Sequence, residues 1–130
     1  MTIDLGGDHR SRYVFSIRFR LEPAADIRVD PAEFETTVVR PAVPPGEPGW
    51  RFFRDNLWRG ELSAPDHFRE LLVEALNVPV VDVSYRRFET TPDELAALEA
   101  VIADSLESFR ADSVAEVRSK YFGGSIEVIR

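Results

Sequence analysis

The chain has 130 residues, enough for one domain with its own core, and its 44% hydrophobic and 30% charged residues are typical of folded globular proteins. The absence of cysteine excludes disulfides, thiolate catalysis and zinc sites that need sulfur ligands. The net charge of −7 comes from the second half of the chain. Residues 1–60 carry nine basic and nine acidic residues, whereas residues 61–130 carry seven basic and fourteen acidic residues. This negative charge disfavours nucleic acid as a partner.

The first predicted elements are two strands that follow a polar N-terminal tail, residues 1–11. Over residues 13–21, apolar side chains alternate with mostly polar ones, which is the period of a half-buried strand. Residues 34–40, with the run Thr-Thr-Val-Val, predict a second strand that ends at Pro41. The intervening sequences EPAAD and DPAE mark turns, so the two strands are expected to form an antiparallel ribbon.

A loop is predicted next, by the sequence RPAVPPGEPGW. It contains four prolines and two glycines within eleven residues. Proline has no backbone N–H to donate, which excludes this stretch from a helix interior or a central strand.

The following segment predicts a helix and then a strand. Residues 65–76 place apolar side chains at helical spacing after a proline in the first turn, and the helix should end near Asn77. Residues 78–89 have the apolar composition of a strand. Three residues of this strand are expected to share one face: Val81, Val83 and Tyr85.

The C-terminal part predicts two more helices and a last strand. Thr91 and Glu94 form a capping box that opens a long helix, whose apolar stripe runs to residue 109 opposite an acidic face. Asp112 or Ser113 should cap a third helix, which Gly123 ends before a strand at residues 125–129.

Together these elements predict an α+β fold in one domain over residues 12–130. We expect a mainly antiparallel sheet of four to six strands, with two or three helices packed on one face. The helix at residues 65–76 could connect two strands that add one parallel pairing.

Side chains suited to catalysis or metal binding are scarce. His9 lies in the tail and His67 in a predicted helix, with no second histidine at i+4. The chain has no G-x-S-x-G nucleophile motif and no glycine-rich nucleotide loop after a strand. We therefore find no catalytic motif and expect neither a metal nor a cofactor.

One segment, residues 50–60 with the sequence WRFFRDNLWRG, holds both tryptophans, two phenylalanines and three arginines. One local structure that fits it is a helix ending at Gly60. Such a helix would place three apolar residues on one face: Trp50, Phe53 and Leu57. Its other face would carry three charged residues that pair with one another: Arg51, Asp55 and Arg59.

The other local structure is a hairpin with a tight turn at residues 55 and 56. Phe53 would then face Trp58, and Phe52 would face Arg59, across two short strands. The hairpin leaves the arginines freer to meet an outside anion or carboxylate. It is the preferred interpretation, because Trp and Phe are enriched in strands.

The tripeptide Leu57-Trp58-Arg59, in the setting FFRDNLWRGEL, resembles the LWR-salt proteins, a family of halophilic archaea named for it. The resemblance covers most of the chain. It implies a salt-loving host and a cytoplasmic protein, and it implies no activity, cofactor or ligand residues.

The composition points the same way without that resemblance. Fifteen of the sixteen basic residues are arginine, Lys120 is the single lysine, and the pI is near 4.8. A high-GC genome would favour arginine over lysine, and a salt-rich cytoplasm would favour an acidic surface; of these overlapping explanations we prefer salt adaptation. No stretch approaches the roughly 20 apolar residues of a membrane helix, and the N-terminus lacks the features of a signal peptide. We expect a cytoplasmic protein without a membrane partner.

The leading functional hypothesis is a non-enzymatic domain that contacts a protein partner, or a second copy of itself, through residues 50–60. The candidate contact residues are Trp50, Arg51, Arg54, Trp58, Arg59, Arg86 and Arg87. The alternative is a ligand-binding or enzymatic site in which these arginines clamp a small phosphate or carboxylate ligand by bidentate hydrogen bonds. RNA stacking on Trp50 and Phe52 is opposed by the net charge.

Overall fold

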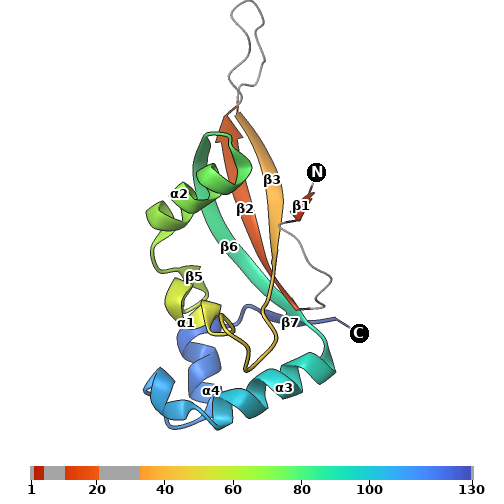
Figure 1. Ribbon diagram of the computed structural model, residues 1–130, viewed down its shortest axis with the longest axis vertical. Helices are drawn as coiled ribbons and strands as arrows, with labels where there is room; N and C mark the ends of the chain where they lie inside the picture. The colour runs from red at the N-terminus through yellow and green to blue at the C-terminus, as the bar shows by residue number, and fades with distance from the viewer. Residues whose placement is uncertain (1, 5–10, 21–32, 130) are drawn as a thin grey trace, which may run out of the picture.

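A computed structural model describes residues 2–4, 11–20 and 33–129. Its main sheet has five strands in the order β1-β3-β2-β6-β7 (Figure 1). The strands are β1 Thr2–Asp4, β2 Arg12–Arg20, β3 Glu33–Pro41, β6 Val80–Thr90 and β7 Ile126–Val128. The short strands β4 Leu57–Trp58 and β5 Glu61–Leu62 form a separate antiparallel pair.

The long pairings of the main sheet are antiparallel and the short ones are parallel. The central strand β2 pairs antiparallel with β3 on one side and with β6 on the other. Three residues of β1 pair parallel with β3, and three residues of β7 pair parallel with β6. The predicted ribbon of the first two long strands is confirmed, and the parallel pairing expected near residues 65–76 is wrong. Strand β6 instead reaches its parallel neighbour β7 through the helices of residues 92–122.

The pairing of β2 with β6 contains two irregularities that change which side chains are buried. Phe15 pairs with Tyr85 whereas Val14 pairs with Arg87, so Arg86 is an extra residue. A second shift leaves Val81 extra. The prediction that Val81 shares a face with Val83 and Tyr85 is therefore wrong, and its neighbour Val80 is buried instead.

Four α-helices occur within the described ranges. They are α1 Phe52–Asn56, α2 Pro65–Leu76, α3 Pro92–Ala103 and α4 Val114–Val117, with a 3-10 helix η1 at Leu106–Phe109 and a π-helix η2 at Arg118–Phe122. The capping box is confirmed, because the Thr91 hydroxyl accepts from the Glu94 N–H and donates to the Glu94 carboxylate. Asn77 ends α2 in the left-handed conformation, and Ser113 caps α4.

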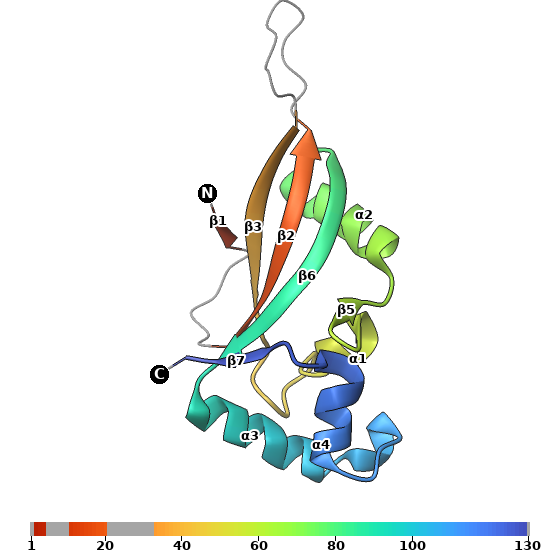
Figure 2. The same ribbon diagram turned by 180° about the vertical axis from the view of Figure 1, so that it is seen from behind.

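Helices α2 and α1 lie against one face of the sheet, and α3 lies across its end (Figures 1 and 2). Aromatic side chains carry the contact with the sheet. Phe68 of α2 lies 4.7 Å from Phe15 between ring centroids, and Phe52 of α1 lies 4.6 Å from Tyr13. Phe122 of η2 contacts Phe88 of β6 at 5.1 Å on the same face. The predicted α+β class with helices on one face of the sheet is confirmed.

None of the helices in the part of the chain described here combines the length and the apolar character needed to cross a membrane.

Candidate interaction surface

The segment of residues 50–60 adopts neither predicted structure along its whole length. It begins with turns, continues as the short helix α1, and ends in the β4-β5 hairpin. The helix prediction is right for the apolar side chains, since all three are buried: Trp50, Phe53 and Leu57. It is wrong for the charged ones, because α1 ends at Asn56 and Leu57 is already extended.

The preferred hairpin prediction is wrong in its turn. The strands pair Leu57 with Leu62 and Trp58 with Glu61, so the turn consists of Arg59 and Gly60 rather than residues 55 and 56. Both turn residues have positive φ, 51° and 83°, as in a type I′ turn. Glycine adopts this conformation freely, whereas for arginine it is strained.

The turn is fixed against η2 by close backbone contact. The Arg59 N–H donates to the Lys120 carbonyl at 2.8 Å, and the Gly60 N–H donates to the Tyr121 carbonyl at 2.9 Å. A Cβ atom on Gly60 would lie 2.9 Å from the Phe122 carbonyl oxygen, which is too close for any side chain. The hairpin tip therefore needs glycine for its packing as well as for its φ.

The tripeptide at the start of the hairpin divides between core and surface. Leu57 is 1% exposed, whereas Trp58 is 46% exposed and Arg59 is also exposed. The Trp58 ring packs edge-on against Tyr121 at a centroid distance of 6.1 Å, and the Arg59 guanidinium lies 5.7 Å from the indole centroid. Trp58 is thus positioned by neighbours while almost half of its surface faces solvent.

An open groove of about 600 Å³ lies beside the indole. It is lined by Trp58, Arg59, Glu116, Ser119, Lys120 and Gly123. We call these six residues the Trp58 groove. One side of the groove is far from Trp58 in the sequence, since it comes from α4, η2 and Gly123. No sequence pattern marks those residues as part of a site.

The other predicted contact residues lie elsewhere. Trp50 is a core residue that packs edge-on against Phe109 at 5.8 Å. The Arg51 guanidinium lies over the Trp50 ring at 4.6 Å, and its Nε is buried without a hydrogen-bond partner among the described residues. Arg54 donates to its neighbour Asp55 at 3.0 Å.

The two predicted arginines of β6 diverge from this segment and from each other. Arg86, at the β-bulge, is exposed and lines a different groove with Glu61 and Leu62. Arg87 pairs with Glu89 at 2.6 Å and with Glu127 at 3.4 Å. The structure brings together Trp58 and Arg59 but does not gather the arginines around one pocket.

A charged cluster on the sheet face opposite the helices surrounds Glu89. This carboxylate is 6% exposed and accepts from Arg12 Nε and Arg87 Nε, both at 2.6 Å. Burial alone would raise the pKa of Glu89, but hydrogen bonds and charge from Arg87 and Arg12 outweigh burial, and the pKa lies below its usual value. A carboxylate held as an anion in this way cross-links strands and is unsuited to proton transfer.

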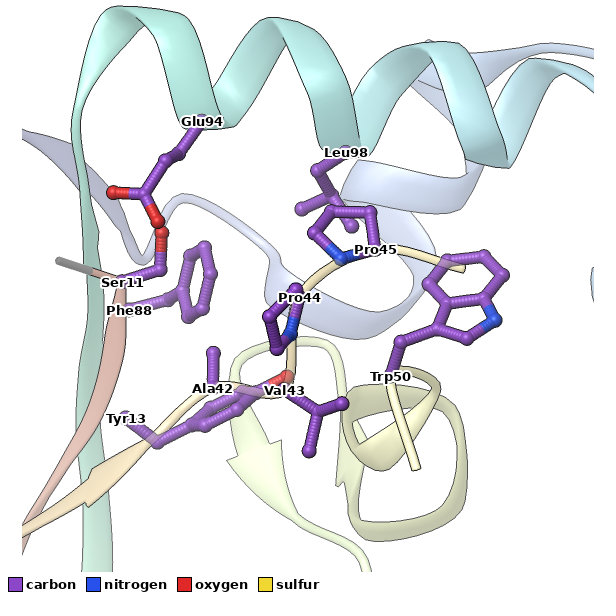
Figure 3. A pocket seen from close by; sticks show the side chains of 10 residues that line it. All are labelled: Ser11, Tyr13, Ala42, Val43, Pro44, Pro45, Trp50, Phe88, Glu94 and Leu98. Carbon is purple, nitrogen blue, oxygen red and sulfur yellow. The ribbon is translucent and has the colours of Figure 1, made fainter. Parts of the chain in front are cut away.

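A small cavity lies under the proline-rich loop, between the start of β2, β6 and α3 (Figure 3). Its walls are mostly apolar: Tyr13, Ala42, Val43, Pro44, Pro45, Trp50, Phe88 and Leu98. The two polar lining residues are already bonded, Ser11 to the Thr90 hydroxyl at 2.8 Å and Glu94 in the capping box. Its volume of about 20 Å³ can hold a water molecule, far below the roughly 300–1,000 Å³ of small-molecule sites.

Metal-binding side chains do not cluster within the described ranges, where no group of three or more acidic or histidine residues could hold an ion. His67 is exposed on α2, as the sequence indicates for a surface residue. His9 falls outside the residues that the structure describes.

The chain was compared with known proteins by sequence and by structure. A family model described as LWR-salt protein matches residues 9–130, which is nearly the whole chain. No curated protein and no solved structure matches it. The match spans both sides of the Trp58 groove, so the hairpin and the C-terminal helices fall within one family unit.

Proposed function

The chain belongs to the LWR-salt protein family, and we propose that it is a non-enzymatic protein-interaction domain whose exposed Trp58 and Arg59 contact the partner. One observation carries the proposal: a tryptophan and an arginine project from a rigidly held turn without completing the core or any ion pair of the described residues. We further propose that the protein works in the cytoplasm of a salt-adapted cell, which its acidic, arginine-rich composition supports.

The conformation of Arg59 supports a role outside the fold. A type I′ turn favours Asn, Asp or Gly at both central positions, and a larger residue with positive φ costs about 1–2 kcal/mol. Arg59 accepts this strain with φ 51°, yet its side chain is exposed and has no carboxylate partner in the described ranges. The backbone conformation serves the contact of the turn with η2, but the choice of a long charged side chain there does not, and strained positions are often functional.

The residue types also support a protein partner. Trp and Arg are the residues most enriched at the energetic centres of protein interfaces, because they combine a large contact area with directed hydrogen bonds. Trp58 supplies a half-exposed indole, and Arg59 supplies a guanidinium beside it. Since the turn is tied to η2 by two backbone hydrogen bonds, little backbone entropy would be lost on binding.

The alternative function, a clamp of converging arginines on a small anion, has less support. Arg54 and Arg87 are engaged by carboxylates of the same chain. Arg59 and Arg86 line separate grooves. A protein contact needs only one exposed patch, and we therefore prefer it.

The test compares two exposed apolar residues that differ in their setting. Trp58 on the hairpin and Leu71 on α2 are 46% and 44% exposed, so replacing either with alanine should cost only about 1–2 kcal/mol and leave the protein folded. We expect Trp58→Ala, and not Leu71→Ala, to abolish association measured by light scattering and co-purification from native extract in high salt. A wild-type protein that stays monomeric and retains no partner, or equal association of Trp58→Ala, would contradict the proposal.

A further inference from the structure

Resting on this proposed function, we infer that the partner presents an acidic segment, with a carboxylate next to an apolar side chain, to the Trp58 groove. Trp58 would contact the apolar side chain. Arg59 and Lys120 would receive the carboxylate.

The backbone brings the two cations together although 61 positions separate them in the sequence. The Arg59 N–H donates to the Lys120 carbonyl at 2.8 Å, so the two residues are joined directly. Gly123 allows this approach, because a Cβ atom there would lie 3.0 Å from the Arg59 carbonyl oxygen. Both side chains line the same groove.

The groove keeps an excess of positive charge, and its two cations form no ion pair within the described part of the chain. Neither Arg59 nor Lys120 forms an ion pair there, and Lys120 Nζ instead donates to the Phe109 carbonyl at 2.9 Å. That bond fixes the ammonium group and leaves two of its three N–H donors for a ligand. Glu116, the one acidic residue of the lining, accepts from the Asp112 N–H at 2.8 Å and keeps its negative charge, so the lining has two cations against one anion.

The aromatic side of the groove selects for an apolar neighbour of the carboxylate. Trp58 packs edge-on against Tyr121, and its exposed surface remains available beside the Arg59 guanidinium. A single-stranded nucleic acid would also offer anions and stacking groups, but the net charge of −7 repels a polyanion at long range. A short acidic peptide carries fewer negative charges than a nucleic acid, so the same long-range repulsion opposes it less.

The experiment titrates the protein with three probes and follows its tryptophan fluorescence. Because Trp50 is buried, Trp58 should account for most of the change in fluorescence. The probes are the peptide Glu-Leu-Glu-Glu-Leu-Glu with blocked ends, its glutamine counterpart Gln-Leu-Gln-Gln-Leu-Gln, and a short oligouridylate. We expect the acidic peptide to bind at least about five-fold more tightly than the glutamine peptide. Arg59→Gln and Lys120→Gln should each weaken it roughly two- to five-fold, whereas Arg86→Gln, an exposed arginine of another groove, should not.

The outcomes separate this inference from the function on which it rests. Equal binding of both peptides, binding of neither, or preference for the oligouridylate overturns the inference. If Trp58→Ala still abolishes association in those cases, the interaction function stands with a different partner. If Trp58→Ala leaves association unchanged, both proposals fail.

Discussion

Two regions of this molecule use the same kind of side chain in opposite ways. On the face of the sheet opposite the helices, Arg12 and Arg87 share the buried carboxylate of Glu89 at 2.6 Å each. In the Trp58 groove, Arg59 and Lys120 lie side by side with no carboxylate partner among the described residues. Arginine-rich composition alone therefore says little about function, and the pairing of each cation decides it.

The two regions also differ in whether their cations stabilise the fold or remain available to bind another molecule. The buried carboxylate of Glu89 cross-links two strands, and removing it would leave Arg12 without an ion pair in the described residues and Arg87 with Glu127 alone. Arg59, which has no carboxylate partner there, contributes little to the fold beyond its contact with the Trp58 ring and remains free for another molecule. The following predictions test this contrast, beginning with the largest expected effect.

Replacing Glu89 with alanine should destabilise the protein by about 1–2 kcal/mol, because two charge-assisted hydrogen bonds are lost while the guanidinium groups of Arg12 and Arg87, 45% and 42% exposed, stay solvated. The control is Glu127→Ala, which removes a 60% exposed carboxylate from the same arginine and should cost less than about 0.5 kcal/mol. Denaturant unfolding of the three proteins at constant salt measures both changes. Equal losses for the two variants would show that the Glu89 cluster is no stronger than a surface pair.

At the hairpin beside the groove, the stability of the fold should depend on the backbone more than on the charged side chains. We expect Gly60→Ala to cost about 2 kcal/mol, since its Cβ meets the Phe122 carbonyl oxygen at 2.9 Å in addition to the strain of positive φ. Gly46→Ala is the matched control, because Gly46 has φ +90° but an added Cβ there would meet no atom within 4 Å beyond its chain neighbours, and it should cost only about 1 kcal/mol. Thermal or urea unfolding should reveal the larger loss at Gly60.

Acid should weaken the charged cluster around Glu89. Because the folded-state pKa of Glu89 is lowered, its contribution is fully present above the usual pKa of a glutamate, near 4.5, and is lost as pH falls through the lower folded value. The stability difference between wild type and Glu89→Gln should therefore be constant from pH 7 down to about pH 5 and shrink below that. A difference that persists unchanged at pH 3 would contradict the charged state of Glu89.

The smallest effect should have the opposite sign. Arg59→Gly relieves the positive φ of 51° and should stabilise the protein by about 0.5–1 kcal/mol, while it weakens association with the partner. Unfolding and binding measured on the same preparation test both statements. A loss of stability would mean that Arg59 serves the fold after all.

Much of the fold could be predicted because its signals are local. Alternation over β2, the capping box of Thr91 and Glu94, and the glycine after η2 each act within a few residues. The two bulges of β6 could not be predicted, since they depend on the register with β2 and no residue of β6 marks them. Simple alternation along β6 therefore places Val81 on the wrong face.

The site was harder to predict because its structure depends on a distant segment. The sequence RG has glycine at the second position of a two-residue turn, and Leu57 and Leu62 flank it symmetrically, which was an available signal for the true hairpin. The partner of that turn, residues 118–123, gives no such signal. In the sequence, Lys120 therefore stands out only as the single lysine and not as a site residue.

That single lysine has a practical consequence. Because every other basic side chain is arginine or histidine, an amine-reactive reagent can modify only Lys120 besides the amino terminus. Its Nζ is held at the Trp58 groove by the Phe109 carbonyl, so a fluorophore or cross-linker attached there would report from the groove itself. The protein can thus be labelled chemically, without any substitution, at the surface where we expect its partner to bind.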